Sequence, residues 1–216
     1  MGREHGRRRI YRSRSLRRRR SAFVLCILAA LAGGVLAAGQ SRGSERVTYD
    51  RRAAAAYADT WALRTNPAYW SSPDNDCADF VSQCLTAGGL RPLSGADGDW
   101  HENGNDFPSV AWVNCPAQKR TLSAEGRDHT RYIAHVTMSL PRDWAAGDVV
   151  YLGNTVKGEI AWQHVIVCAG RDHGQWAYDS HTTAYMRQPL EVWYPAHFSL
   201  IRYCHIADSV SYGARR

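Results

Sequence analysis

The stretch from Asp76 to Leu85 places a cysteine at the start of a predicted helix. Its apolar residues recur at the spacing of one helix face, at Cys77, Phe80, Val81, Cys84 and Leu85. Asp76 is a typical N-cap residue, and Gly88-Gly89 predicts that the helix ends after Ala87. Backbone N–H groups and the helix dipole at this end favour a thiolate. We therefore predict that Cys77 is a nucleophile.

A cysteine nucleophile needs a base to take its proton and a third group that holds this base in one tautomer. His164 is the candidate base because it opens a predicted buried strand, directly before Val165-Ile166-Val167. The next predicted strand carries Asp179 and His181 on one face, since alternate strand residues point the same way. Across a tight hairpin, either side chain can come near His164. The alternative is structural: a hydrogen-bonded core histidine at 164, an aspartate that starts a turn and a histidine that binds backbone.

Cysteine and histidine also bind zinc, but their spacing in this sequence argues against a zinc site. The sequence has no Cys-x-x-Cys or His-x-x-x-His pair, and Cys77 and Cys84 are too far apart for the usual pair of ligands. It also has no Gly-rich phosphate loop and no Gly-x-Ser-x-Gly elbow. We expect neither a metal nor another cofactor.

Residues 1–38 have the pattern of a secretory signal peptide. Ten arginines lie within residues 1–20, and an uncharged apolar run with small residues at its end follows up to Ala38. The run is also long enough for an uncleaved anchor, because a membrane span needs roughly 20 apolar residues. We expect a secreted or cell-surface protein. The alternative is a single-pass membrane anchor that carries an extracellular domain.

The net charge of +7 comes from this leader. Of the 27 basic and 20 acidic residues, ten Arg and one Glu lie in residues 1–38. The remaining chain has 17 basic and 19 acidic residues, a net charge of −2. This balance argues against a nucleic-acid partner. We expect contact with a membrane only through an uncleaved leader.

The odd number of cysteines after the leader indicates at least one free thiol. Exported proteins meet oxidising conditions, in which cysteines tend to pair. The five are Cys77, Cys84, Cys115, Cys168 and Cys204. Cys84 lies two helical turns from Cys77, beyond the Cα separation of about 4.4–6.8 Å that a disulfide needs. We predict that Cys77 is free, and the pairing of the other four stays open.

Helices are predicted early in the mature chain and strands later. This order predicts an α+β domain in which N-terminal helices pack on a C-terminal antiparallel β-sheet. The predicted regions are a linker at 39–48, the domain at 49–208 and a tail at 209–216. Within the domain we predict a helix at 51–63, strands at 148–152, 164–168 and 175–181, and a hairpin turn at Asp172-His173-Gly174.

A long loop is predicted at residues 91–109, which are rich in Gly, Asp, Asn and Pro. Loops of this length in a compact domain often belong to a binding rim. We predict that Trp100 and Trp112 line a substrate groove there. The alternative for each indole is packing in the core.

The segment Asn75–Gly89 resembles the signature of the putative amidase domain family, a group of papain-like thiol hydrolases related to NlpC-like and CHAP cell-wall hydrolases. Three further segments resemble the family in the same order, from about Tyr49 to Leu190. They are the helix with Tyr57-Ala58 and then Asn66-Pro67-Ala68-Tyr69, the segment Trp144–Tyr151, and His164–Val167 with Tyr178–Thr182.

The resemblance implies a papain-like (NlpC/CHAP-type) core and an exported cysteine amidase or peptidase. Cys77 would attack an amide carbonyl to form a thioester, and His164 would act as base and then protonate the leaving amine. Asp179 is the implied third residue, with His181 a close second. The oxyanion would be stabilised by the Cys77 N–H and a second donor, Tyr69 or Tyr57. A peptide or peptidoglycan-like substrate is expected by analogy with the related hydrolases.

Two other functions stay open. One is a catalytically silent binding module on the same fold, which uses the Trp-bearing loop; the presence of both Cys77 and His164 argues against it. The other is a disulfide-stapled surface domain in which Cys77 is bridged.

Overall fold

Six antiparallel strands form the main sheet of the computed structural model, which describes residues 45–94, 99–104, 106–123 and 132–212. The predicted leader at 1–38 lies outside these residues. In sheet order the strands are β2 (Ile133–Thr137), β7 (Leu200–Ile206), β3 (Val149–Val156), β4 (Glu159–Asp172), β5 (Gln175–Ser180) and β6 (Tyr185–Pro189). The predicted turn between β4 and β5 is confirmed. His173 and Gly174 both have positive φ, as a two-residue hairpin turn requires.

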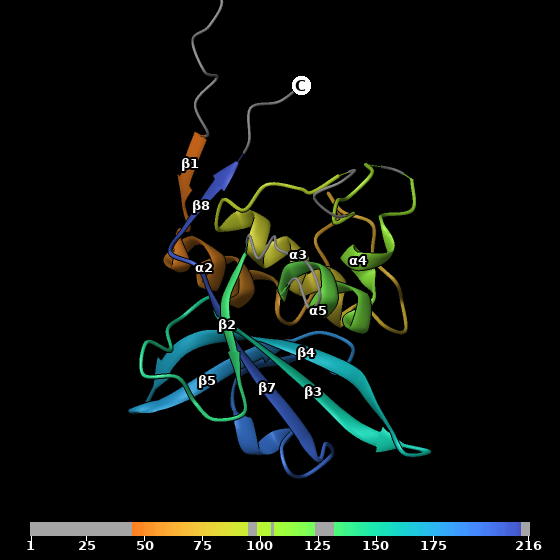
Figure 1. The fold of residues 1–216 in the computed structure, drawn as a ribbon, viewed down its shortest axis with the longest axis vertical. Helices are drawn as coiled ribbons and strands as arrows, with labels where there is room; N and C mark the ends of the chain where they lie inside the picture. Colours follow the sequence, from red (N-terminus) through yellow and green to blue (C-terminus); the bar gives the residue numbers. More distant parts are fainter. Residues whose placement is uncertain (1–44, 95–98, 105, 124–131, 213–216) are drawn as a thin grey trace, which may run out of the picture. The chain divides into compact units, whose positions relative to one another are not determined.

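Four α-helices of the described residues cover one face of this sheet (Figure 1). They are α2 (Arg51–Trp61), α3 (Cys77–Ala87), α4 (Val110–Val113) and α5 (Cys115–Ser123). The predicted α+β arrangement, with helices packed on a later antiparallel sheet, is confirmed. Asp50 caps α2, because its carboxylate accepts the Ala53 N–H at 2.9 Å. None of the described helices has the length and apolar character needed to cross a membrane.

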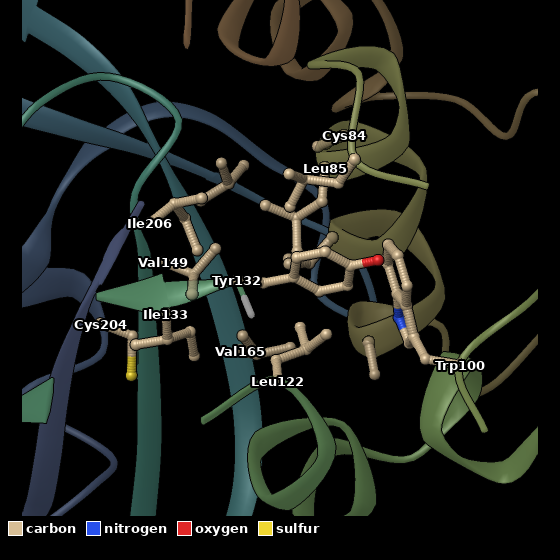
Figure 2. Packing of buried hydrophobic residues seen from close by; sticks show 14 of the residues in the cluster. Cys84, Leu85, Trp100, Leu122, Tyr132, Ile133, Val149, Val165, Cys204 and Ile206 are labelled. Carbon is tan, nitrogen blue, oxygen red and sulfur yellow. The ribbon is translucent and has the colours of Figure 1, made fainter. Parts of the chain in front are cut away.

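Alternate residues of β4 face two separate apolar layers. Val165 and Val167 pack with residues of α3 in the larger layer, part of which is shown in Figure 2. Ile166 and Cys168 belong to a second layer on the other side of the sheet, together with Leu152. We call these two sides the helix face and the far face. Because strand side chains alternate, the face on which a β4 residue lies follows from its position.

Trp100 and Trp112 lie in the core, which corrects the prediction that they line a groove. Both side chains have 0% exposure and pack against each other at 5.0 Å between ring centroids. Their indole N–H groups are also used internally. Trp100 donates to the Ser82 hydroxyl at 2.8 Å, and Trp112 donates to the Asp79 carboxylate at 2.6 Å. The long loop and helix α4 therefore each contribute one of these rings to the core, as aromatic side chains with a satisfied polar atom often do.

The two ends of the described domain pair with each other. β1 (Glu45–Thr48) and β8 (Ser209–Tyr212) form an antiparallel two-stranded sheet in which Glu45 lies opposite Tyr212. Arg91 ties this pair together: its guanidinium binds the Glu45 carboxylate and lies over the Tyr212 ring at 5.1 Å. Residues 45–48 and 209–212, predicted as linker and tail, thus extend the compact unit to Glu45–Tyr212.

Asp148 joins three parts of the fold at the start of β3. Its carboxylate is fully buried and accepts from the Arg51 guanidinium at 2.6 Å and from the Ile206 N–H at 2.9 Å. It also binds the His205 ring and the Ala145 N–H, each at 2.9 Å. Helix α2, strand β7 and the turn before β3 are therefore held by one side chain.

We expect Asp148→Ala to lower the free energy of unfolding by about 3–5 kcal/mol, because removing this buried carboxylate leaves Arg51 with only the exposed Asp208 as a charge partner and leaves the Ile206 N–H without an acceptor. Urea denaturation followed by circular dichroism measures this. Asp208→Ala is the matched control, since Asp208 also pairs with Arg51 but its side chain is 80% exposed. Its loss should change stability by at most about 1 kcal/mol. Equal effects of the two substitutions would contradict the role given to Asp148.

Candidate active site

The Cys77 thiol is buried where α3 begins. The side chain is 2% exposed, and its S–H donates to the Asn75 side-chain oxygen at 3.8 Å. Burial raises the pKa of the Cys77 thiol. A hydrogen bond from the backbone N–H of Val165, which directly follows His164, partly offsets this increase. The expectation that the helix N-terminus yields a thiolate is therefore corrected: burial outweighs it. Cys77 needs a base to become a nucleophile.

Thr182 supplies the helix cap that we predicted for Asp76. The N–H groups of Asp76 and Cys77 both donate to the Thr182 hydroxyl oxygen, each at 3.1 Å. The Asp76 side chain makes no cap hydrogen bond; it accepts the Thr182 N–H at 2.9 Å instead. Two backbone N–H groups that converge on one oxygen beside a thiol have the arrangement of oxyanion donors. Thr182 is not among the predicted site residues, and its one signal in the sequence is a hydroxyl residue directly after His181.

His181 positions the start of α3. One ring nitrogen is 2.8 Å from the Asp76 carboxylate and the other is 2.8 Å from the Trp61 carbonyl. The ring also stacks on Phe80, with centroids 4.0 Å apart. Burial disfavours the charged imidazole, but the hydrogen bonds to Asp76 and Trp61 outweigh it and raise the pKa of His181. Both nitrogens are thus engaged away from His164.

His164 lies on the far face of the sheet, near the turn that follows β5. It lies opposite Leu152 of the neighbouring strand β3, and its ring stacks on Phe198 with centroids 5.8 Å apart. Nε2 is buried and has no hydrogen-bond partner among the described residues. Burial lowers the pKa of His164 to about 4, so the ring is neutral at neutral pH and able to accept a proton.

Two features bring Cys77 close to His164: a contact with the backbone of the adjacent residue Val165, and Thr182, which lies beside both side chains. The thiol contacts the Val165 N–H, and Val165 directly follows His164. Thr182 lines a cavity together with His164, while its hydroxyl binds the Cys77 N–H. Within the described chain, no hydrogen bond joins the Cys77 sulfur to the His164 ring.

Asp179 faces the helices, opposite Val167 in β4. Its Oδ1 accepts the Arg187 N–H at 2.6 Å, and its Oδ2 has no partner among the described residues. Burial raises the pKa of Asp179 to about 7, and the nearby Asp59 carboxylate adds to this increase. The structure forms no hydrogen bond between Asp179 and His164, two residues that it describes.

Tyr69, the predicted oxyanion donor, lies over Trp112 with ring centroids 6.3 Å apart. The other candidate, Tyr57, donates its hydroxyl hydrogen to the Gln83 amide oxygen at 2.7 Å. All five cysteines that the structure describes are free, so Cys77 is not bridged there. Within residues 45–94, 99–104, 106–123 and 132–212, no group of three or more His, Cys, Asp or Glu side chains is arranged to hold a metal ion.

The pKa values of the two histidines should be shifted in opposite directions from the usual value. We expect the His164 ring to gain its proton near pH 4 and the His181 ring to lose its proton above pH 6.5. NMR titration of the imidazole C–H resonances, assigned with His164→Gln and His181→Gln, measures both. Unfolded His164 binds a proton near pH 6.5, so its burial makes the folded protein less stable as pH falls from 6.5 to 4. A His164 midpoint at or above 6.5 would contradict the buried environment.

Comparison with known proteins places this chain in a family. The chain is 27% identical over 173 residues to "Uncharacterized protein YhbB" of Bacillus subtilis (strain 168), which covers 76% of this chain and 52% of that protein. The chain thus spans about half the length of this curated relative. No solved structure matches the chain. Residues 48–201 match the model of the family described as "Putative amidase domain", and this chain therefore belongs to that family.

Proposed function

We propose that this protein is a cysteine-dependent amide hydrolase in which Cys77 is the nucleophile and His164 the base. The Cys77 sulfur attacks the amide carbonyl carbon while His164 takes the thiol proton. The carbon–nitrogen bond then breaks, and the amine leaves with that proton. Water, deprotonated by His164, hydrolyses the thioester and restores the thiol. This sequence needs no oxidant or other co-reactant.

The observation that carries the proposal is the position of the Cys77 thiol against the Val165 N–H, next to His164. The thiol is protonated and the imidazole is neutral, so the pair starts with the proton on sulfur and a base nearby to receive it. Because Nε2 of His164 has no partner among the described residues, turning the ring toward the thiol breaks no hydrogen bond at that atom. Catalytic hydrogen bonds are often long or unformed before substrate binds.

The other site residues take separate roles in this proposal. We assign His181 to hold Asp76 and the start of α3, because both of its ring nitrogens are engaged there. That Asp179 orients His164 stays a prediction. For the oxyanion we propose the converging N–H groups of Asp76 and Cys77 once substrate displaces the Thr182 hydroxyl, with Tyr69 as the predicted further donor.

The proposed substrate is a peptide that the protein meets outside the cell, such as a cell-wall peptide. Export is proposed from the pattern of residues 1–38. We also propose that the helices and sheet form a papain-like core, since a cysteine at a helix N-terminus faces a strand that carries histidine.

Mass spectrometry of protein recovered from the culture medium should find a chain that begins at Gly39. An intact leader on membrane-bound protein would support the anchored alternative.

Reaction of the folded protein with iodoacetamide tests the nucleophile and its base. We expect Cys77 to be the most rapidly modified cysteine, and His164→Ala to slow its modification by at least about 10²-fold, the usual contribution of a general base. Peptide mapping by mass spectrometry identifies the modified residue. Cys77→Ala should abolish hydrolysis of a peptide amide, and Tyr69→Phe in the same assay measures the contribution of its hydroxyl.

His173→Ala is the matched control, because His173 is an exposed histidine in the turn after β4. It should leave the labelling rate unchanged. Labelling of Cys77 that stays rapid in His164→Ala would reject the proposed pair. An unreactive Cys77 in the folded protein would favour the binding module, for which the unformed thiol–imidazole hydrogen bond is the supporting observation.

A further inference from the structure

A second cavity, of about 440 Å³, lies on the far face of the sheet. Residues of β4, β5 and β7 line it together with the short helix η2 (Leu190–Val192), and the four α-helices lie on the opposite side of the sheet (Figure 1). Its volume falls within the range of ligand pockets, about 300–1,000 Å³. It shares no described residue with the cavity beside His164. It is therefore a separate candidate binding site.

Aromatic rings and planar polar side chains line this second cavity together. They are Trp176, Tyr178 and Tyr203, with Arg171, Gln175 and Glu191. The Arg171 guanidinium lies 4.3 Å from the centre of the Trp176 ring and donates to the Gly174 carbonyl at 2.6 Å. Trp144 meets Tyr203 edge-on with ring centroids 5.2 Å apart. The Trp176 and Tyr203 side chains are half-buried, so they are held in place and still present part of their surface to a ligand.

The polar groups of this cavity are accessible and available for a ligand. Gln175 and Glu191 are exposed, and neither side chain, nor the Tyr203 hydroxyl, has a hydrogen bond or ion pair to another described residue. Burial raises the pKa of Tyr203, and the nearby Tyr194 and Glu191 side chains add to this increase. An amide donates and accepts, a carboxylate accepts, and a phenol does either. The cavity thus offers several hydrogen bonds that a ligand can complete.

Charge and polarity together define the class of ligand. Arg171 and Glu191 carry one positive and one negative charge, and the other described residues that line the cavity are uncharged. A charged ligand would be attracted by one of the two and repelled by the other, so an uncharged ligand is favoured. A purely apolar ligand would cover these polar groups without giving them a partner, which is costly. The ligand is therefore an uncharged molecule that has both an apolar surface and several polar groups.

A pyranose sugar combines these properties, because its ring C–H groups form an apolar surface and its hydroxyl groups project from the edge. We propose that this cavity binds an uncharged pyranose unit of a glycan. The C–H surface packs against Trp176 and Tyr203, and the hydroxyl groups bind the Gln175 amide and the Glu191 carboxylate. This site goes beyond the proposed function, because sugar binding there requires no reaction at Cys77.

Isothermal titration calorimetry of the full chain at neutral pH tests the ligand class. The probes are two uncharged tetrasaccharides, cellotetraose and N-acetylchitotetraose, and the anionic tetragalacturonate. We expect an uncharged sugar to bind at least about tenfold more tightly than tetragalacturonate, whose carboxylates are repelled by Glu191. In NMR spectra the uncharged sugar should move the indole N–H resonance of Trp176 and leave that of Trp61, on α2, in place. Tighter binding of tetragalacturonate, or binding of neither uncharged sugar, would overturn the proposal.

Glu191→Ala should change the two affinities in opposite directions. Binding of the uncharged sugar should weaken at least about tenfold, because a hydrogen bond to a carboxylate is lost. Binding of tetragalacturonate should strengthen, because Arg171 is then the one charged side chain among the described residues that line the cavity. Glu159→Ala is the matched control, since Glu159 is an exposed glutamate at the start of β4 that does not line the cavity. It should leave both affinities unchanged, and equal effects of the two substitutions would reject this cavity as the sugar site.

The glycan site and the hydrolase fail separately. Cys77→Ala should bind the uncharged sugar as tightly as the unsubstituted protein, so an inert Cys77 overturns the hydrolase alone. A Cys77 that reacts rapidly with iodoacetamide in a His164-dependent manner, in a protein that binds no sugar, overturns the glycan site alone. A peptide that moves the Trp176 indole resonance where the sugars do not would make the cavity a peptide site and would also overturn the proposed ligand class.

Discussion

The site depends on one set of reciprocal hydrogen bonds between the start of α3 and the chain after β5. Thr182 binds the N–H groups of Asp76 and Cys77, while Asp76 binds the Thr182 N–H and the His181 ring. Thr182 has φ of 74°, a left-handed conformation that is rare for a β-branched residue. Such strain persists only where neighbouring contacts hold it, and here three hydrogen bonds between Thr182 and the start of α3 do so. The helix that carries the thiol is thereby fixed against the sheet that carries the histidine.

Burial sets the resting protonation of both groups. At the Cys77 thiol burial keeps the proton on, and at the His164 imidazole burial keeps the proton off. Neither group is charged at rest, so the protein bears no isolated buried ion at this point. Charge separates only when the proton moves. The interior thus holds a protonated thiol together with a neutral base that can take its proton.

Most of the secondary structure could be predicted because its signals are local. The stripe of apolar residues around Cys77 and the run Val165–Val167 each mark an element by periodicity alone. The burial of Trp100 and Trp112 could not be predicted, because the partners of their indoles, Ser82 and Asp79, are 18 and 33 positions away. The role of Thr182 was hidden for a similar reason: its partners Asp76 and Cys77 are 106 and 105 positions away.

The pairing of β1 with β8 gives the domain a mechanical property. Glu45 and Tyr212 are opposite each other at the outer end of this ladder, so tension applied to both ends of the domain acts there first. In this antiparallel geometry the ladder opens one residue pair at a time, while the six-stranded sheet bears none of the force. Arg91 binds the side chains of that first pair and so resists the first step. A chain pulled at both ends would therefore lose the four residue pairs of this ladder before any force reached the site.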